Sequence, residues 1–547
     1  MANSDNQVQQ PGTEGGMPPE SLLQYGGMAG EPDNMQEQAL DETERKRRKD
    51  QEELTDEEKR LMHTKRIPDS IASVKRVLEE TVGLGRSFDV VLREMVFGKQ
   101  RTGIFYLNGL VKDSVLTEVL ARMSYLSEDE VDSRTLTMFM EKYIPHIQVE
   151  KVETMTDTIN KVLAGGTAVF IENETAAIVI DAKSFPVRSS EEPSLERVVR
   201  GSRDGFVETL LTNVTLVRRR LRDPRLKLEM MQVGERTKTD VCVAYINDIA
   251  DQKLVESIRD KIRKLETDGL PLAEKQLEEA LLDKKWNPYP VVRYSERPDV
   301  ISSHLLEGHV ALFVDTSPSV IILPSTFFHL VQHAEEYRQT PFIGTYLRWV
   351  RYFGIFSSLF LLPLWFLMVA HPEFKPAGMG WLGPQESGHL PLLVQFVIAE
   401  VGIDLMRMAA VHTPTPLATA MGLIAAILIG DIAIKTGVFV PEVILYLSVA
   451  TIGIFATPSY ELGLANRVTR LILLIVTAAF SVPGLVVGTT LWVLLLAFQR
   501  SFNSPFLWPF IPFNAKALYN IIVRAPFSQE KSRLSLTKPN DSSRQPT

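Results

Sequence analysis

The stretch YFGIFSSLFLLPLWFLMVA, Tyr352–Ala370, decides the fold class because it is apolar throughout and contains no charged residue. At 1.5 Å per residue, a helix over this stretch is long enough to cross the ~30 Å hydrocarbon layer of a bilayer. Arg348 and Arg351 precede it, so the positive-inside rule predicts that the preceding chain is cytoplasmic. We therefore expect a soluble region up to residue 340 and an all-α membrane domain after it.

Further apolar stretches extend the predicted membrane domain over residues 341–513. The clearest are Leu417–Gly437, Val438–Thr457 and Leu471–Phe498. The last contains a Pro-Gly pair, which predicts one kinked span or a span with a re-entrant half. Leu392–Val411 is a further candidate, so we predict a polytopic domain of four or five spans. The arginine distribution does not decide between the two numbers, and the side of the C-terminus stays open.

The soluble region, residues 67–340, alternates helix and strand patterns, which predicts an α/β fold. AVFIENETAAIVIDA, Ala168–Ala182, is typical of two strands joined by a turn. The sequence becomes loop-like at residues 184–193, so we expect two α/β cytoplasmic subdomains, 67–190 and 191–340.

The two ends of the chain differ from this pattern. Residues 1–66 are rich in Gln, Gly, Pro and charge and lack apolar periodicity, which predicts a disordered tail. Its basic residues stand beside an acidic block that cancels them, so we expect no nucleic-acid partner. Residues 514–547 are predicted to be a mostly disordered cytoplasmic tail. Early apolar residues typical of a signal peptide are missing, which also favours a cytoplasmic N-terminal region.

Catalytic motifs are missing from the soluble region. It has no phosphate loop, dinucleotide fingerprint, H-E-x-x-H or G-x-S-x-G sequence, so we expect neither an enzyme nor a cofactor. The single cysteine, Cys242, excludes an intrachain disulfide. His329 and His333 have the i, i+4 spacing of a metal pair on one helix, but no carboxylate motif accompanies them and we expect no metal site. An amphipathic helix before the membrane is the simpler interpretation.

The basic segment VRRRLRDPRLK, Val217–Lys227, has two interpretations that the sequence leaves open. It could face lipid headgroups or pair with acids of a neighbouring subunit. Alternatively, cations at the end of a helix complement the helix dipole and have a structural role.

Three charged residues interrupt the apolar stretch LLVQFVIAEVGIDLMRMAAV. Glu400, Asp404 and Arg407 share one helical face, and Asp404 and Arg407 are spaced for an i, i+3 ion pair. An ion path, the wet side of a surface helix and an internal ion pair are the alternatives. An unpaired carboxylate at the bilayer centre is costly. We therefore predict a helix at the membrane interface whose charged face binds a neighbouring span or subunit and acts in assembly or gating.

A second charged group lies in LIGDIAIKTGVFVPEVI. Asp431 and Lys435 are spaced i, i+4, and Glu442 begins the next apolar stretch. They are either a polar lining for an ion path, repeated around a symmetry axis, or an ion pair at the headgroup level. The candidate pore-lining residues are Gly430, Asp431, Lys435, Thr436, Val438, Val440 and Glu442.

Three long blocks resemble the GerA family of spore germination A subunits. Arg200–Asp251 and Glu296–Phe328 are similar to the two signature regions of the soluble part. Ala399–Gly437 is similar to the family's segment of two acids and an arginine with the span that follows. The resemblance extends from Ile67 to Phe513.

This resemblance implies a multi-pass protein of the spore inner membrane, with its N-terminal region on the spore core side. It implies a homo-oligomer, a pentamer, that works with other integral membrane germination subunits and conducts monovalent cations during germination. The alternative is a non-conducting receptor or scaffold subunit for germination signalling. The ion selectivity, the gating signal and the identity of the partner subunits are not predicted.

Overall fold

The computed structural model describes residues 66–126, 135–144, 146–185, 196–282, 286–375, 378–386, 388–412, 422 and 427–544. Residues 65–547 form one compact unit, which contains every element described below. The predicted N-terminal tail, most of the predicted loop at 184–193 and the first part of the predicted span at 417–437 lie outside the described residues.

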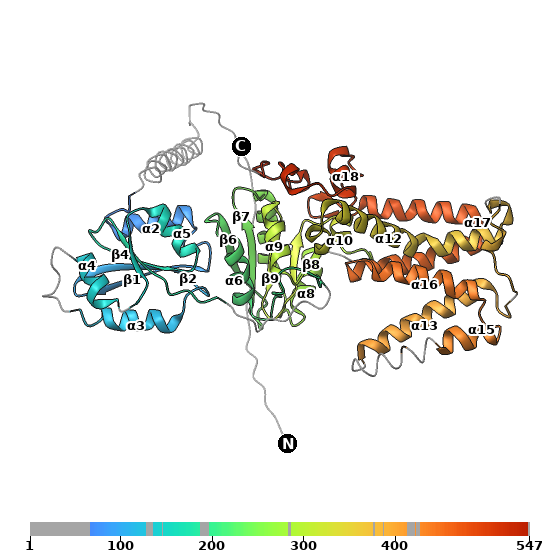
Figure 1. Cartoon of the computed structure of the whole chain (residues 1–547), viewed down its shortest axis with the longest axis horizontal. Coiled ribbons are helices and arrows are strands. Elements are labelled where there is room, and N and C mark those ends of the chain that lie inside the picture. Colours follow the sequence, from blue (N-terminus) through green and yellow to red (C-terminus); the bar gives the residue numbers. More distant parts are fainter. Residues whose placement is uncertain are drawn as a thin grey trace, which may run out of the picture. The chain divides into compact units, whose positions relative to one another are not determined.

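The first part of this unit is a five-stranded antiparallel sheet with the order β1-β2-β4-β5-β3 (Figure 1). Its strands are β1 (Val90–Phe97), β2 (Gln100–Leu107), β3 (Val149–Val152), β4 (Thr167–Ile171) and β5 (Ala177–Ile180). Helices α2 (Ile71–Thr81) and α5 (Met155–Leu163) cover one face. The other face carries α3 (Asp113–Met123), α4 (Thr135–Met138) and the π-helix η2 (Phe139–Tyr143).

Local sequence accounts for these strands. β1 and β2 form a hairpin closed at Gly98 and Lys99, whose positive φ angles of 52° and 67° are those of a tight turn matched to the strand twist. β4 and β5 are buried along their whole length because helices cover both faces of the sheet. They are the strand pair predicted at Ala168–Ala182, and the fold is α/β with two antiparallel sheets as its framework.

The second sheet repeats the strand order of the first, as β6-β7-β9-β10-β8, and is also antiparallel. It contains β6 (Leu226–Val233), β7 (Thr239–Ile246), β8 (Arg293–Ser295), β9 (Val310–Val314) and β10 (Val320–Leu323). Helices α6 (Leu210–Arg220) and α9 (Pro298–Leu306) pack on one face. The opposite face carries α7 (Gln252–Arg263) and α8 (Ala273–Leu282).

A buried ion pair joins the two sheet regions. Nε of Arg218, in α6, lies 2.7 Å from Oδ2 of Asp89, just before β1, and both side chains are buried. The same guanidinium donates to Oγ of Ser87 and to the carbonyl of Leu226. Burial lowers the pKa of Lys227 to about 8, and its Nζ donates to the carbonyl of Thr81.

The basic segment Val217–Lys227 therefore pairs with acids of its own chain. Besides Arg218, Arg220 binds Asp204 at 2.9 Å and Arg225 binds Asp223 at 2.8 Å. The sequence left headgroups, a neighbouring subunit and the helix dipole as alternatives. The structure adds a fourth role, because Arg218 and Arg220 of α6 bind acids of preceding segments of the same chain and Arg225 binds an acid of its own segment.

A helical part follows the second sheet. It comprises α10 (Phe327–Val331), α11 (Ala334–Arg338), α12 (Pro341–Ala370), α13 (Leu392–His412), the π-helix η5 (Ile427–Ile432), α15 (Ala433–Lys435), α16 (Pro441–Phe455) and α17 (Tyr460–Phe498). Short 3-10 turns lie at Pro372–Phe374 and Gly380–Leu382. In the described part of the chain, α12 and α17 are long and apolar enough to cross a membrane, and α16 is a shorter apolar helix. Backbone at Ser481 (φ 53°) kinks α17 beside Pro483, at the predicted break.

The last residues contain more structure than predicted. β11 (Arg500–Ser501) and β12 (Ser504–Pro505) form a short hairpin, followed by α18 (Ala515–Ile522) and 3-10 turns at Phe527–Gln529 and Ser535–Thr537. Ile521 and Leu536 are buried in a cluster with Phe328 of α10. Oγ1 of Thr537 donates to the carbonyl of Glu307 at 2.7 Å. The prediction of a mostly disordered 514–547 segment differs from the structure up to residue 544, because these few apolar residues find a surface to bury against.

Candidate functional site

A buried cluster of charges joins α13 to α17. Glu400 of α13 lies between Arg467 and Arg470, which are one turn apart on α17. Oε2 of Glu400 is 3.0 Å from Nε of Arg467, and Oε1 is 2.5 Å from Nη2 of Arg470. The side chains are 4%, 7% and 0% exposed, respectively. One carboxylate thus stands against two guanidiniums inside an apolar helical part.

One turn further along α13, Asp404 and Arg407 do not form the ion pair that their spacing predicts. Asp404 pairs with Arg467 rather than with Arg407. The guanidinium of Arg407 lies over the ring of Tyr460, 4.6 Å from its centroid. The expected i, i+3 pair is therefore wrong, because α17 brings a second arginine to Asp404 and an aromatic face to Arg407. Asp404 is 50% exposed, so it has an accessible side besides its contact with Arg467.

The cluster also contacts the first long helix and the soluble region. Nη1 of Arg470 donates to the carbonyl of Ser358 in α12 at 2.9 Å. Thr469, the residue before Arg470 on α17, has its Oγ1 2.9 Å from the hydroxyl of Tyr289, a buried residue shortly before β8. Nε1 of Trp492 donates to the same hydroxyl at 2.6 Å. Helix α17 is therefore attached to the segment that leads into β8, the edge strand of the second sheet.

A second buried carboxylate lies where α12 begins. Glu336 of α11 is fully buried and pairs with both Arg348 (2.7 Å, Nε to Oε2) and Arg351 of α12. Nη1 of Arg348 also donates to the carbonyls of Asn520 and Ile521 in α18. From the sequence alone, these two arginines indicate only which end of the predicted span is cytoplasmic. Their shared acid was missed because Glu336 belongs to a short helix without a distinctive pattern.

The candidate pore-lining residues differ in exposure and in their partners. Asp431 and Lys435 pair at 2.6 Å, and their side chains are 58% and 71% exposed. Thr436 donates to the carbonyl of Ile432, and Gly430 and Val438 are half-buried beside them. Val440 is buried and its N–H donates to Oε1 of Gln395 in α13 at 2.9 Å. Oε1 of Glu442 accepts from the N–H of Gln385 at 3.0 Å.

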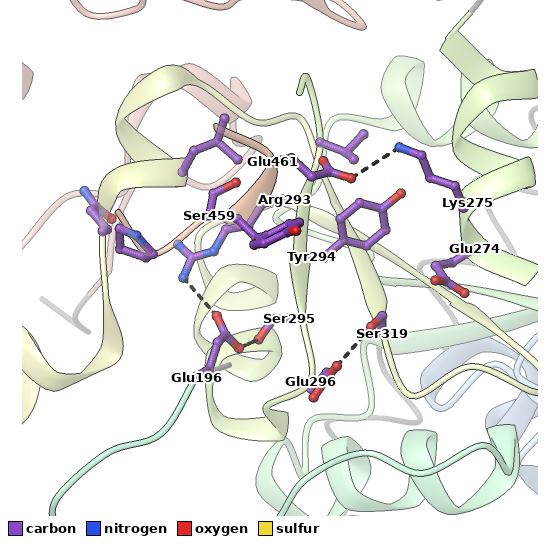
Figure 2. A pocket seen from close by; sticks show the side chains of 15 residues that line it. Glu196, Glu274, Lys275, Arg293, Tyr294, Ser295, Glu296, Ser319, Ser459 and Glu461 are labelled. Atoms are coloured by element: carbon purple, nitrogen blue, oxygen red, sulfur yellow. Dashed lines mark hydrogen bonds and ion pairs between the residues drawn. The ribbon is translucent and has the colours of Figure 1, made fainter. Parts of the chain in front are cut away.

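A cavity of about 250 Å³ lies between β8 and the start of α17 (Figure 2). Four carboxylates line it from four separate segments: Glu196, Glu274, Glu296 and Glu461. Lys275 and Arg293 are the cations among its lining residues. Nζ of Lys275 is 3.3 Å from Oε1 of Glu461, and Nη2 of Arg293 is 3.6 Å from Oε1 of Glu196.

The excess of acids gives this cavity a preference for positive charge. Burial raises the pKa of Glu296, and the charges of Glu196 and Glu274 raise it further. Oγ of Ser319 donates to Oε1 of Glu296 at 3.3 Å. Such a site suits an ammonium group, whose charge the acids would attract. No pattern in the sequence predicts this cavity, because its residues come together only when β8 meets α17.

Three buried histidines form a triangle beside α9 and α10. The ring centroids of His304, His309 and His329 are 5.0–5.9 Å apart. Burial lowers the pKa of each, that of His309 to about 4, so the rings are neutral. His333 lies outside this triangle: α10 ends at Val331 and α11 begins at Ala334, so the predicted single helical face for His329 and His333 is wrong. Within the described ranges, no group of three or more His, Cys, Asp or Glu side chains has an arrangement that could hold a metal ion.

These features define a class of protein in which two antiparallel α/β sheet regions precede membrane-capable helices tied together by buried charges. A family model described as Bacillus/Clostridium GerA spore germination protein matches residues 76–536, and the chain belongs to this family. The resemblance inferred from the sequence is thereby confirmed, and with it a role in sporulation and spore germination.

Individual relatives match along most of their length. The chain is 48% identical over 476 residues to Stage V sporulation protein AF of Bacillus subtilis (strain 168), covering 87% of this chain and 97% of that protein. It is 28% identical over 477 residues to Spore germination protein KA of the same organism, covering 86% and 88%. The N-terminal domain of the A subunit of the Bacillus megaterium spore germinant receptor GerK3 is 25% identical, with a TM-score of 0.38, covering 48% of this chain and 97% of that one.

Proposed function

We propose that the chain is a subunit of an oligomeric channel that conducts monovalent cations across the spore inner membrane during germination. The germination role follows from family membership. The observation that supports conduction is the exposure of the Asp431–Lys435 ion pair, which lies between α13 and α16 in the sequence.

The surroundings of these two charges support conduction. Asp431 and Lys435 are both more than half exposed in the single chain, while Ile432, next to Asp431, and Leu445 of α16 are apolar and exposed. A charged side chain facing hydrocarbon costs roughly 2.5–3.5 kcal/mol on insertion scales. If this segment lies within the membrane, the charges need water or another subunit opposite them. Copies arranged around an axis, as a pentamer, would supply both, with the exposed side chains of residues 430–442 lining the path.

The charge cluster on α13 fits a role in assembly or gating. Glu400 is buried against α17, whereas Asp404 is half exposed and remains accessible to a neighbouring subunit. Arg407 lies at the end of the same face. We expect Arg407→Glu to reduce oligomer formation first. Intact oligomers with altered ion selectivity would instead place Arg407 in the pore.

The test is cation flux through liposomes that contain the purified full chain together with its partner subunits. We expect the wild type to release monovalent cations and Asp431→Asn to change the release rate. Asp268→Asn is the matched control, because Asp268 belongs to an exposed ion pair with Arg236 in the soluble region. Absence of flux from correctly assembled wild-type oligomers would contradict a channel.

A non-conducting receptor or scaffold is the second candidate function. The cavity in Figure 2 favours it, because Tyr294 of β8 and Glu461 of α17 both line the same space. A ligand there could change how the sheet region contacts the helices without opening a pore. Mass measurement of the oligomer, combined with the flux assay, separates the two functions: a strict monomer without flux supports the receptor.

A further inference from the structure

A second cavity, of about 370 Å³, lies between the helices of the membrane part. Arg351 of α12 and Arg407 of α13 line it, together with Thr457, which follows α16, and Tyr460, which begins α17. Its volume falls within the ~300–1,000 Å³ typical of small-molecule sites. Four separate helices thus contribute to one hollow with two guanidiniums in its wall.

The cavity lies at one end of the apolar helices, where the surface of a membrane crossed by them would fall. It includes the end of α16 and the start of α17, and Arg351 directly precedes the charge-free stretch Tyr352–Ala370. Glu461, the neighbour of Tyr460, reaches Lys275 of the soluble region at 3.3 Å. The cavity therefore lies at the end of the helices that adjoins the second sheet. The headgroups of the lipid leaflet on that side would lie at this level.

The charge of the cavity is positive. Arg351 shares the single buried carboxylate of Glu336 with Arg348, so two guanidiniums face one acid. Arg407 contacts the uncharged ring of Tyr460, and the nearby acid on its own helix, Asp404, pairs with Arg467. The pKa of His333, which also lines the cavity, is lowered to about 4 by burial and by the charge of Arg351.

We propose that this cavity binds the phosphate group of an anionic ligand, with Arg407 and Arg351 as its principal contacts. A guanidinium offers several N–H donors in a planar fork that matches phosphate oxygens, and charge-assisted bonds of this kind are strong. The N-terminus of the long helix α17, at Tyr460, adds the positive end of its dipole. Basic pockets between helices on the cytoplasmic side of a membrane suit the headgroups of acidic lipids.

Two sources offer this chemistry: an acidic phospholipid and a soluble phosphate compound. The experiment measures the thermal unfolding of the full chain in a zwitterionic detergent while one probe is titrated. The probes are short-chain phosphatidylglycerol, phosphatidylcholine of the same chain length, and inorganic phosphate. We expect phosphatidylglycerol to raise the unfolding temperature and phosphatidylcholine to leave it unchanged, because ligand binding to the folded state stabilises it by mass action.

Arg407→Gln should weaken the apparent affinity for phosphatidylglycerol about tenfold or more, since it removes a charge-assisted contact. Arg407→Lys keeps the charge without the fork and should give an intermediate affinity. Arg263→Gln, at an exposed position of α7, is the matched control and should behave as the wild type. Light scattering on each variant separates a loss of binding from a loss of oligomers.

The outcomes divide clearly. Stabilisation by phosphatidylglycerol alone, reduced in Arg407→Gln, supports the proposal with a lipid as the source. Equal stabilisation by inorganic phosphate, reduced in the same variant, supports it with a soluble anion as the source. Stabilisation that is absent, or that is the same in Arg407→Gln and the wild type, overturns it. If Arg407→Gln does not fold, Arg407→Lys gives the same comparison. The proposal does not depend on ion conduction, because unfolding is measured without a bilayer or a gradient.

Discussion

Glu400 and Arg467 are 67 residues apart in the chain, yet Nε of the arginine lies 3.0 Å from Oε2 of the glutamate. Both side chains are buried, at 4% and 7% exposure. A second bond, 2.6 Å from Nη2 of Arg467 to the backbone carbonyl of Glu400, fixes the guanidinium at one turn of α13. The pair therefore sets the register in which α13 lies against α17.

Glu400→Gln should destabilise the helical part strongly. The amide leaves the guanidiniums of Arg467 and Arg470 buried without the carboxylate they share, and breaking a buried pair on one side costs about 3–5 kcal/mol. Asp404→Asn changes the same chemical group at a half-exposed position and should cost about 1 kcal/mol or less. Thermal unfolding of the full chain in detergent measures both. An equal loss of stability in the two variants would show that the burial of Glu400 does not determine the cost of removing its charge.

Asp89→Asn should loosen the contact between the two sheet regions. Arg218 binds this carboxylate through Nε and Nη2, at 2.7 and 3.2 Å, and all of these groups are buried. Removing the charge of Asp89 leaves a buried guanidinium unpaired, at a cost of about 3–5 kcal/mol. Denaturant unfolding should shift to lower concentration, and proteolysis between the sheets should become faster. Arg219→Gln, an exposed neighbour that stacks on Phe185, is the control and should change little.

The free energy of unfolding should fall when the pH falls from about 6.5 to about 4. Burial lowers the pKa of His309 to about 4 and also lowers those of His304 and His329. An unfolded histidine titrates near 6.5, so between these values the unfolded chain binds more protons than the folded chain. The difference for His309 alone corresponds to about 3 kcal/mol, fully present above pH ~6.5 and lost toward pH ~4.

Unfolding temperatures measured across this pH range test the histidine triangle. His309→Gln should reduce the slope, because one of the three titrating rings is gone. His146→Gln, in an exposed loop, should keep the wild-type slope. A slope that does not change in His309→Gln would mean that other groups control the pH dependence.

Patterns confined to neighbouring residues were the ones that could be read from the sequence. The strands β4 and β5 follow from a short run of β-branched and apolar residues interrupted by a turn, and the kink in α17 follows from its Pro-Gly pair. Helical spacing also predicts an ion pair between Asp404 and Arg407, and this prediction is wrong because Asp404 pairs with Arg467. In an apolar helix the spacing shows which residues share a face, but it does not show what the next helix places opposite them.

The missed features share this cause. Glu336 meets two arginines only when α11 folds against α12. His329 of α10 meets His304 and His309 only through tertiary contacts. The chain leaves helical geometry at Gln332 (φ −77°, ψ 142°), which takes His333 off the helical face of His329. The acids of the cavity in Figure 2 come from segments up to 265 positions apart, Glu196 and Glu461 being its first and last acids. Pairings of this kind depend on tertiary contacts that no sequence period encodes.

Gly453→Ala should destabilise the packing of α12 on α16, although alanine favours a helix over glycine by about 1 kcal/mol. A Cβ at Gly453 would overlap the backbone carbonyl of Gly354, and a backbone atom cannot move aside as a flexible side chain can. The two helices would have to separate, losing the packing contacts that hold helices together in a membrane.

Gly354→Ala is the matched control on the facing helix. Its Cβ would lie 3.5 Å from Cα of Gly453 and from Cβ of Ala456, which is ordinary van der Waals contact. It should therefore be neutral or slightly stabilising, since it gains helix propensity without displacing α16. Unfolding temperatures of both variants in detergent measure the difference. If the two alanine variants change the unfolding temperature equally, Gly453 does not face the carbonyl of Gly354. The register of α12 on α16 would then differ from the one described.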